Sequence, residues 1–111
     1  MIISTEVLRH HVAYTAWASA RLMESASQLS DEELTRDFHT ADRNVVGTLA
    51  HIFGADRVWL ARFKGIASPA SATDEDRSIA VLKSEWPLLH ASWAEWVAGL
   101  APSARSNPTA F

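Results

Sequence analysis

The sequence contains no cysteine. This absence excludes disulfides, thiolate nucleophiles and cysteine-ligated zinc, so any bound metal must be held by His, Asp or Glu side chains. The chain also has no apolar run that approaches the roughly 20 residues of a membrane-spanning helix, and no signal peptide pattern. We therefore expect a soluble, cytoplasmic protein.

Positive charge and glycine are both scarce. Ten Lys and Arg residues stand against 13 Asp and Glu, which gives a net charge of -3. Nucleic-acid binding depends on clustered Lys and Arg that neutralise phosphates, so we expect no nucleic-acid partner. The four glycines form neither a phosphate-binding loop nor a Gly-x-Ser-x-Gly nucleophile turn, and no serine triad can be assembled from the spacing.

What the chain does contain is helical periodicity. Of its 111 residues 48% are apolar, enough for one modest core. Long stretches with apolar residues at helical spacing cover residues 5–28, about 43–64 and 79–100, and a short helical segment follows the capping-box sequence that starts at Ser30. No strand alternation occurs. The sequence predicts an all-α bundle over residues 1–100, with three long helices and one short helix.

Proline and small polar residues mark the interruptions. The linker over 66–72 leads to a helix cap at Thr73-x-x-Asp76. Pro87 lies inside the third long helical stretch, where we expect a kink or two helices that meet. Residues 101–111 have neither periodicity nor apolar mass, so we expect an irregular, disordered tail of the kind found in a fragment or a frameshifted product.

Each long helix has a predicted contact face. The first carries a main stripe and a second strip, which suggests contacts on two sides. The main stripe comprises Leu8, Val12, Leu22, Met23, Ala26 and Leu29, and the second strip comprises Ala13, Trp17 and Ala20. The second helix should pack through Val45, Leu49, Ile52, Trp59 and Phe63. The third has an a/d seam that comprises Ile79, Leu82, Trp86, Leu89, Trp93, Trp96 and Leu100.

His51 is the first candidate site residue. Gly47 and Gly54 share its helical face, and two glycines within a helix cost roughly 1 kcal/mol each relative to alanine. One interpretation is that they leave space beside His51 for a metal and its other ligands. The alternative is close packing, with the histidine hydrogen-bonded at the edge of the apolar stripe.

Asp56 is the second anomaly, because it falls on the predicted apolar face and a carboxylate there needs a partner. Arg21 is a candidate partner, and Asp56 could instead orient a metal-ligating histidine. His11 could meet His51 across the bundle, although a core histidine that donates to a carbonyl is the simpler interpretation. His90 lies beside the tryptophan seam, where partial burial against indole is expected.

Several motifs together resemble the DinB (damage-inducible) family, related to YfiT-like metalloenzymes. They are Tyr14-x-x-Trp17-Ala18, the turn from Leu29 to Leu34, and the segment from Gly47 through Thr48-Leu49-Ala50-His51-Ile52-Phe53-Gly54 to Gly65. The resemblance covers about residues 8–100. It implies an up-down-down-up four-helix bundle in which three histidines hold a divalent metal, often zinc or nickel.

The resemblance places His51 at one metal-ligand position. The other two ligands belong to a His-x-x-x-His motif on the last long helix of the family, and this motif is absent from the 111 residues. We therefore expect a bundle of unassigned biochemical role with no complete metal site in one chain. The uncovered part of the Trp86, Trp93 and Trp96 seam, together with the family's tendency to dimerise, predicts a homodimer.

Two alternatives remain open. The first is a metal-dependent thiol S-transferase or hydrolase, whose site is completed in a dimer from His51 with His11 or His90 of either chain. Its co-substrate would be a small-molecule thiol, whose pKa the metal would lower. The second is a non-catalytic interaction or small-molecule-binding module that uses an apolar groove.

Overall fold

The computed structural model describes residues 4–69 and 71–100, and all regular structure in these ranges is helical. The elements are α1 (Thr5–Ala26), α2 (Asp31–Thr35), α3 (Val45–Lys64), the 3-10 turn η1 (Asp74–Asp76) and α4 (Ile79–Ala98). This confirms the prediction of three long helices and one short helix. The predicted disordered tail, residues 101–111, lies outside the described residues.

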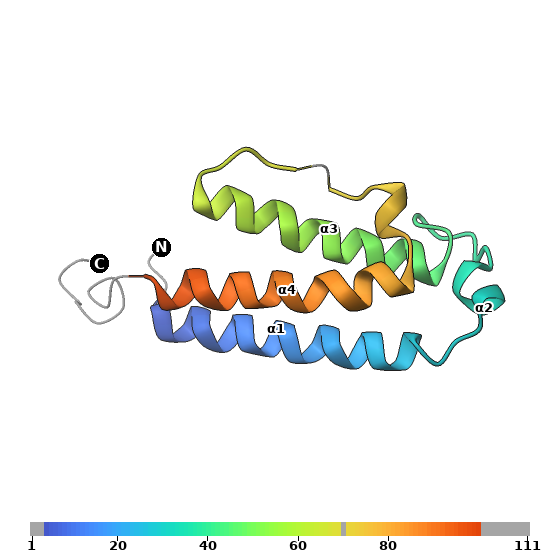
Figure 1. Cartoon of the computed structure of the whole chain (residues 1–111), viewed down its shortest axis with the longest axis horizontal. Helices are drawn as coiled ribbons and strands as arrows, with labels where there is room; N and C mark the ends of the chain where they lie inside the picture. Colours follow the sequence, from blue (N-terminus) through green and yellow to red (C-terminus); the bar gives the residue numbers. More distant parts are fainter. Residues whose placement is uncertain (1–3, 70, 101–111) are drawn as a thin grey trace.

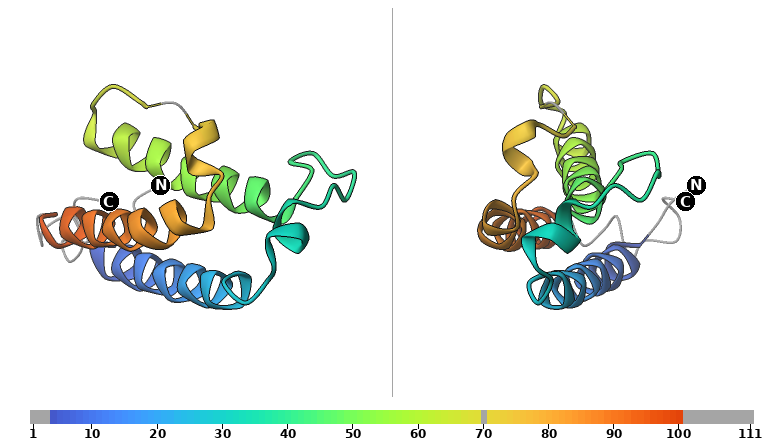
Figure 2. Two further views of the ribbon diagram at one scale, coloured as in Figure 1. Left: turned by 45° about the vertical axis from the view of Figure 1, so that its right-hand side comes forward. Right: turned by 90° about the vertical axis from the view of Figure 1, so that its right-hand side faces the viewer.

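The three long helices run up, down and down. In Figure 1, α3 returns antiparallel to α1, and a long crossover then carries the chain back so that α4 runs parallel to α3. Helix α4 packs against both α1 and α3. Figure 2, seen along the bundle, shows the long helices at the corners of a triangle. The topology agrees with the first three helices of the predicted bundle.

Local chemistry explains where the helices begin and end. The side chains of Ser4, Ser30 and Asn44 accept hydrogen bonds from backbone N–H groups in the first turns of α1, α2 and α3. Ser30 and Glu33 form the predicted capping box. Gly65 ends α3 in the left-handed region, with φ of 72°. The predicted boundaries of α1 and α3 are therefore correct to within about two residues.

The core lies where α4 meets the other helices. Its buried residues are Met23, Ala26, Leu34, Val46, Leu49, Phe53, Leu82 and Trp86. The ring of Phe53 meets the edge of Trp86 at a centroid distance of 5.9 Å. Trp86 is only 1% exposed. In the seam of Trp86, Trp93 and Trp96 any uncovered part therefore excludes Trp86, which α1 and α3 cover from both sides, while Trp93 and Trp96 are half-buried.

Part of the contact face predicted for α1, and part of the one predicted for α3, lies on the surface instead. Leu22 on α1 and Ile52, Trp59 and Phe63 on α3 are 36–51% exposed. On α3 the buried face is displaced toward Val46, Ala50, Phe53 and Leu60, because α4 approaches from that side. The second strip of α1 is also on the surface: Trp17 is 58% exposed and contacts Tyr14 and Arg21 of its own helix.

Helix α4 continues through Pro87 as a single element, so the alternative of two helices that meet there is wrong. Pro87 has no N–H for the Lys83 carbonyl, and the helix tolerates this one missing bond. The predicted cap at Thr73 belongs to η1, where Thr73 and Asp76 form a capping box. Ser78 provides the N-cap of α4 itself.

The two glycines of α3 make room for backbone. A Cβ atom at Gly54 would overlap the Ser71 carbonyl of the crossover, and one at Gly47 would lie 2.5 Å from the Asp42 carbonyl oxygen. The interpretation that they open space for a metal beside His51 is therefore wrong. Close packing is the correct reason, although the neighbours are loop segments.

The crossover is also tied to α3 by an arginine. The Arg57 guanidinium donates to the Asp76 carboxylate at 2.8 Å and to the Ser71 carbonyl at 3.4 Å. Asp76 is 5% exposed, so this ion pair is largely shielded from water. The contacts hold the segment before α4 against the middle of α3. Within the described ranges, no helix is both long enough and apolar enough to cross a membrane.

Candidate functional site

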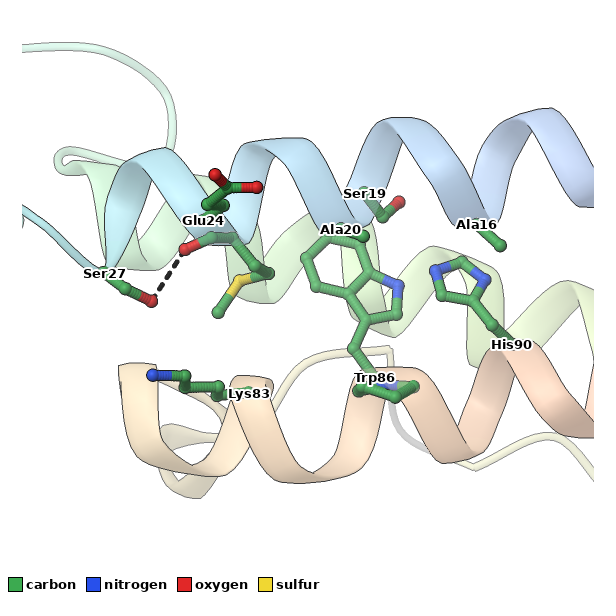
Figure 3. Close-up of a pocket in the computed structure, with 10 residues that line it drawn as sticks. Ala16, Ser19, Ala20, Glu24, Ser27, Lys83, Trp86 and His90 are labelled. Atoms are coloured by element: carbon green, nitrogen blue, oxygen red, sulfur yellow. Dashed lines mark hydrogen bonds between the residues drawn. The ribbon is translucent and has the colours of Figure 1, made fainter.

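A groove of about 490 Å³ lies between α1 and α4. Figure 3 shows Ala16, Ser19 and Ala20 of α1 opposite Trp86 and His90 of α4. The groove is lined by Ala16, Ser19, Ala20, Met23, Glu24, Ser27, Lys83, Trp86, Pro87 and His90. Its volume is within the range of small-molecule sites.

Residue size explains why a groove forms between these two helices. Ala16 and Ala20 stand one turn apart on α1 and leave the space that larger side chains would fill. Met23 and Trp86 supply apolar surface at the base, where both are at most 8% exposed. Ala16, Ala20, Met23, Trp86 and Pro87 form the apolar half of the lining, and the other five lining residues are polar or charged.

His90 supplies the most distinctive polar group of the groove. Its ring lies nearly parallel to the Trp86 indole, with an interplanar angle of 14° and a centroid distance of 6.0 Å. The Nε2 atom is buried and has no hydrogen-bond partner in the described part of the chain. Burial lowers the pKa of His90 below its ordinary value of 6.5, and the charge of Asp56 opposes this shift. The neutral form of His90 therefore predominates at pH 7.

Asp56 lies behind His90, on α3. Its Oδ2 atom accepts a hydrogen bond from Trp86 Nε1 at 3.1 Å, and its backbone carbonyl accepts one from Trp93 Nε1 at 3.2 Å. Burial raises the pKa of Asp56, while the Trp86 hydrogen bond and the nearby His90 act against this shift. The expected pairing with Arg21 is wrong, because Arg21 lies over the Trp17 ring. Asp56 instead joins α3 to α4.

In the structure His51 lies apart from His90 and Asp56. The His51 side chain is 66% exposed, and its Nδ1 atom lies 3.5 Å from Asp42 Oδ1. His11 is exposed on α1, so its interpretation as a core histidine is wrong. Across residues 4–69 and 71–100, no three His, Cys, Asp or Glu side chains gather in a group that could hold a metal ion. The residues of a single chain therefore do not fit the three-ligand metal site that the resemblance implies.

Of the candidate site residues, only His90 and Asp56 are brought together. The predicted second strip of Ala13, Trp17 and Ala20 touches the groove only at Ala20, so it did not locate the groove. A signal was present in the small residues Ala16 and Ala20, which lie one turn apart on one side of α1, with Ser27 just past its end. On α4, Lys83, Pro87 and His90 follow each other at intervals of four and three residues, which likewise places them on one side of the helix.

Comparison with known proteins identifies a family. The sequence model of the DinB family matches residues 1–101. No curated protein and no solved structure matches the chain.

Proposed function

The chain belongs to the DinB family, and we propose that it is a non-catalytic binding module that takes a small apolar molecule in the groove between α1 and α4. The observation that carries this proposal is the groove itself, a space of about 490 Å³ in which Ala16, Ala20, Met23, Trp86 and Pro87 supply apolar surface beside five polar or charged side chains. Sites of this composition bind ligands by burying apolar surface, while single polar groups orient them.

The metal-dependent alternative has less support. His51 faces solvent beside Asp42, and no step of a thiol transfer or hydrolysis can be assigned to the side chains around it. The groove, by contrast, lies beside the buried core of the bundle. A ligand there would contact α1 and α4 together and stabilise their packing.

The test is a titration of the purified protein with naphthalene, followed by two-dimensional NMR. We expect the backbone signals of Ala16, Ala20 and His90 to shift together and to saturate. The variant Ala20→Phe places a ring in the groove and should weaken binding at least 10-fold. Ala13→Phe is the matched control, since Ala13 is exposed on the same helix outside the groove.

A chelator separates this proposal from the metal-dependent alternative. Binding in the groove should be unchanged after treatment with EDTA, because none of its contacts requires a metal. Loss of naphthalene binding in EDTA, or equal binding by Ala20→Phe and the wild type, would contradict the proposal. Stoichiometric zinc or nickel that disappears in His51→Ala would favour the alternative.

A further inference from the structure

We propose that the ligand of the groove is an uncharged aromatic alcohol whose hydroxyl group hydrogen-bonds to His90. This inference rests on the proposed function and names the class of ligand. It follows from the hydrogen-bonding state of His90, the charge behind it and the shape of the groove beside it.

The first argument is hydrogen bonding. His90 Nε2 is buried without a hydrogen-bond partner among the residues that the structure describes. A buried polar atom normally has a partner in the protein or in a bound molecule. His90 lines the groove and is only half-buried as a whole, so rotation of its side chain would turn Nε2 toward a bound ligand. A ligand hydroxyl would then satisfy this atom.

The second argument is charge. Asp56 lies close enough to His90 to interact with it electrostatically, and its carboxylate is held there by Trp86. A ligand carboxylate at His90 would be repelled by this charge and would lose its own hydration. At the other end of the lining, Glu24 and Lys83 carry opposite charges, so no net charge attracts an ionic ligand. A neutral ligand is therefore favoured.

The third argument is shape. The nearly parallel rings of Trp86 and His90 stand side by side on the α4 side of the groove, as Figure 3 shows. Ala16 and Ala20 on α1 are small, so they leave room beside these rings for a ligand. A planar ring fits such a space and can stack against imidazole. These features together favour an aromatic alcohol over a branched aliphatic one.

Three probes with the same ring system test the inference: 2-naphthol, naphthalene and 2-naphthoate, each titrated against the wild-type protein. One added hydrogen bond should make 2-naphthol bind about 5-fold more tightly than naphthalene. We expect 2-naphthoate to bind more weakly than either. The variant His90→Phe keeps a ring beside Trp86 and should abolish the preference for 2-naphthol while naphthalene still binds. His51→Phe, at an exposed position of α3 outside the groove, should keep the preference.

The outcomes separate the two proposals. If naphthalene and 2-naphthol bind equally to the wild type, or if 2-naphthoate binds best, the inference about His90 is wrong and the groove remains a binding site. If none of the three probes binds, the proposed function fails as well. Should His90→Phe fail to fold by circular dichroism, His90→Gln supplies a polar group of similar reach, and it should retain part of the preference.

Discussion

At the scale of single residues, Asp56 is the polar group that connects the core to the groove. Its carboxylate accepts the hydrogen bond of Trp86 Nε1, and Trp86 is almost fully buried. The same carboxylate lies behind His90 in the groove. A polar atom in this position therefore serves both the packing of α4 on α3 and the electrostatics of the proposed ligand site.

Asp56→Leu and Asp56→Asn should differ in stability. Leucine leaves the buried Trp86 N–H without an acceptor, and we expect the free energy of unfolding to fall by about 1–3 kcal/mol. Asparagine keeps an acceptor oxygen and removes the charge whose burial raises the pKa of Asp56, so it should be at least as stable as the wild type at pH 7. Urea unfolding measures both. Equal stabilities of the two variants would show that the hydrogen bond contributes little.

At the scale of elements, the path of the crossover between α3 and α4 depends on a glycine in α3, Gly54. Gly54 lies under the Ser71 carbonyl, and Arg57 binds the same segment from the next turn of α3. The crossover therefore lies directly on the helix, without an intervening layer of side chains. This close approach brings the chain back to the end of the bundle where α4 begins.

Gly54→Ala should destabilise the protein by about 1–3 kcal/mol, because the crossover backbone must move to admit the methyl group. This cost should exceed the gain of roughly 1 kcal/mol that alanine normally brings within a helix. Gly99→Ala is the control: its Cβ would make ordinary contacts at 3.5 Å and 3.6 Å, and its φ of -81° suits alanine. Faster hydrogen exchange around residues 71–77 in Gly54→Ala, and not in Gly99→Ala, would locate the effect.

At the scale of the whole molecule, the arrangement is elongated and open on one flank. The radius of gyration is 16.3 Å, compared with roughly 13 Å for a compact domain of about 100 residues. On α3 and α4 an aromatic cluster of Trp59, Phe63, Trp93 and Trp96 has its rings in contact at centroid distances of 5.5–6.0 Å. Half of the Trp59 and Phe63 surface is exposed. We propose that a second copy of the chain covers this cluster.

Sedimentation velocity at micromolar concentration should therefore show a dimer. Phe63→Lys introduces a charge at the centre of the aromatic cluster and should shift the protein to monomer. Leu88→Lys is the control, since Leu88 is 61% exposed on α4 and lies outside the cluster. A wild-type protein that stays monomeric would contradict the prediction. Dissociation by Trp17→Lys instead of Phe63→Lys would place the interface on the exposed strip of α1.

Helix number, order and ends could be predicted because they depend on local interactions. Ser30 with Glu33, Asn44 before α3 and Gly65 after it act on backbone groups within a few residues. The candidate site was predicted only in part. Asp56 was recognised as an anomaly and His90 was expected against indole, where it stacks on Trp86 of its own helix. The contact between α3 and α4 that brings Asp56 to Trp86 and His90 could not be predicted, because periodicity within one helix carries no information about a neighbour.

The family and the all-α fold thus followed from the order of motifs and from helical spacing, which are properties of the chain itself. The buried face of α3, the partner of Asp56, the exposure of His51 and the groove between α1 and α4 depended on how the helices pack. The physical reason is that a stripe of apolar residues gives the direction of the buried face around the helix axis only approximately. Which part of that face is buried is decided by the direction from which α4 approaches.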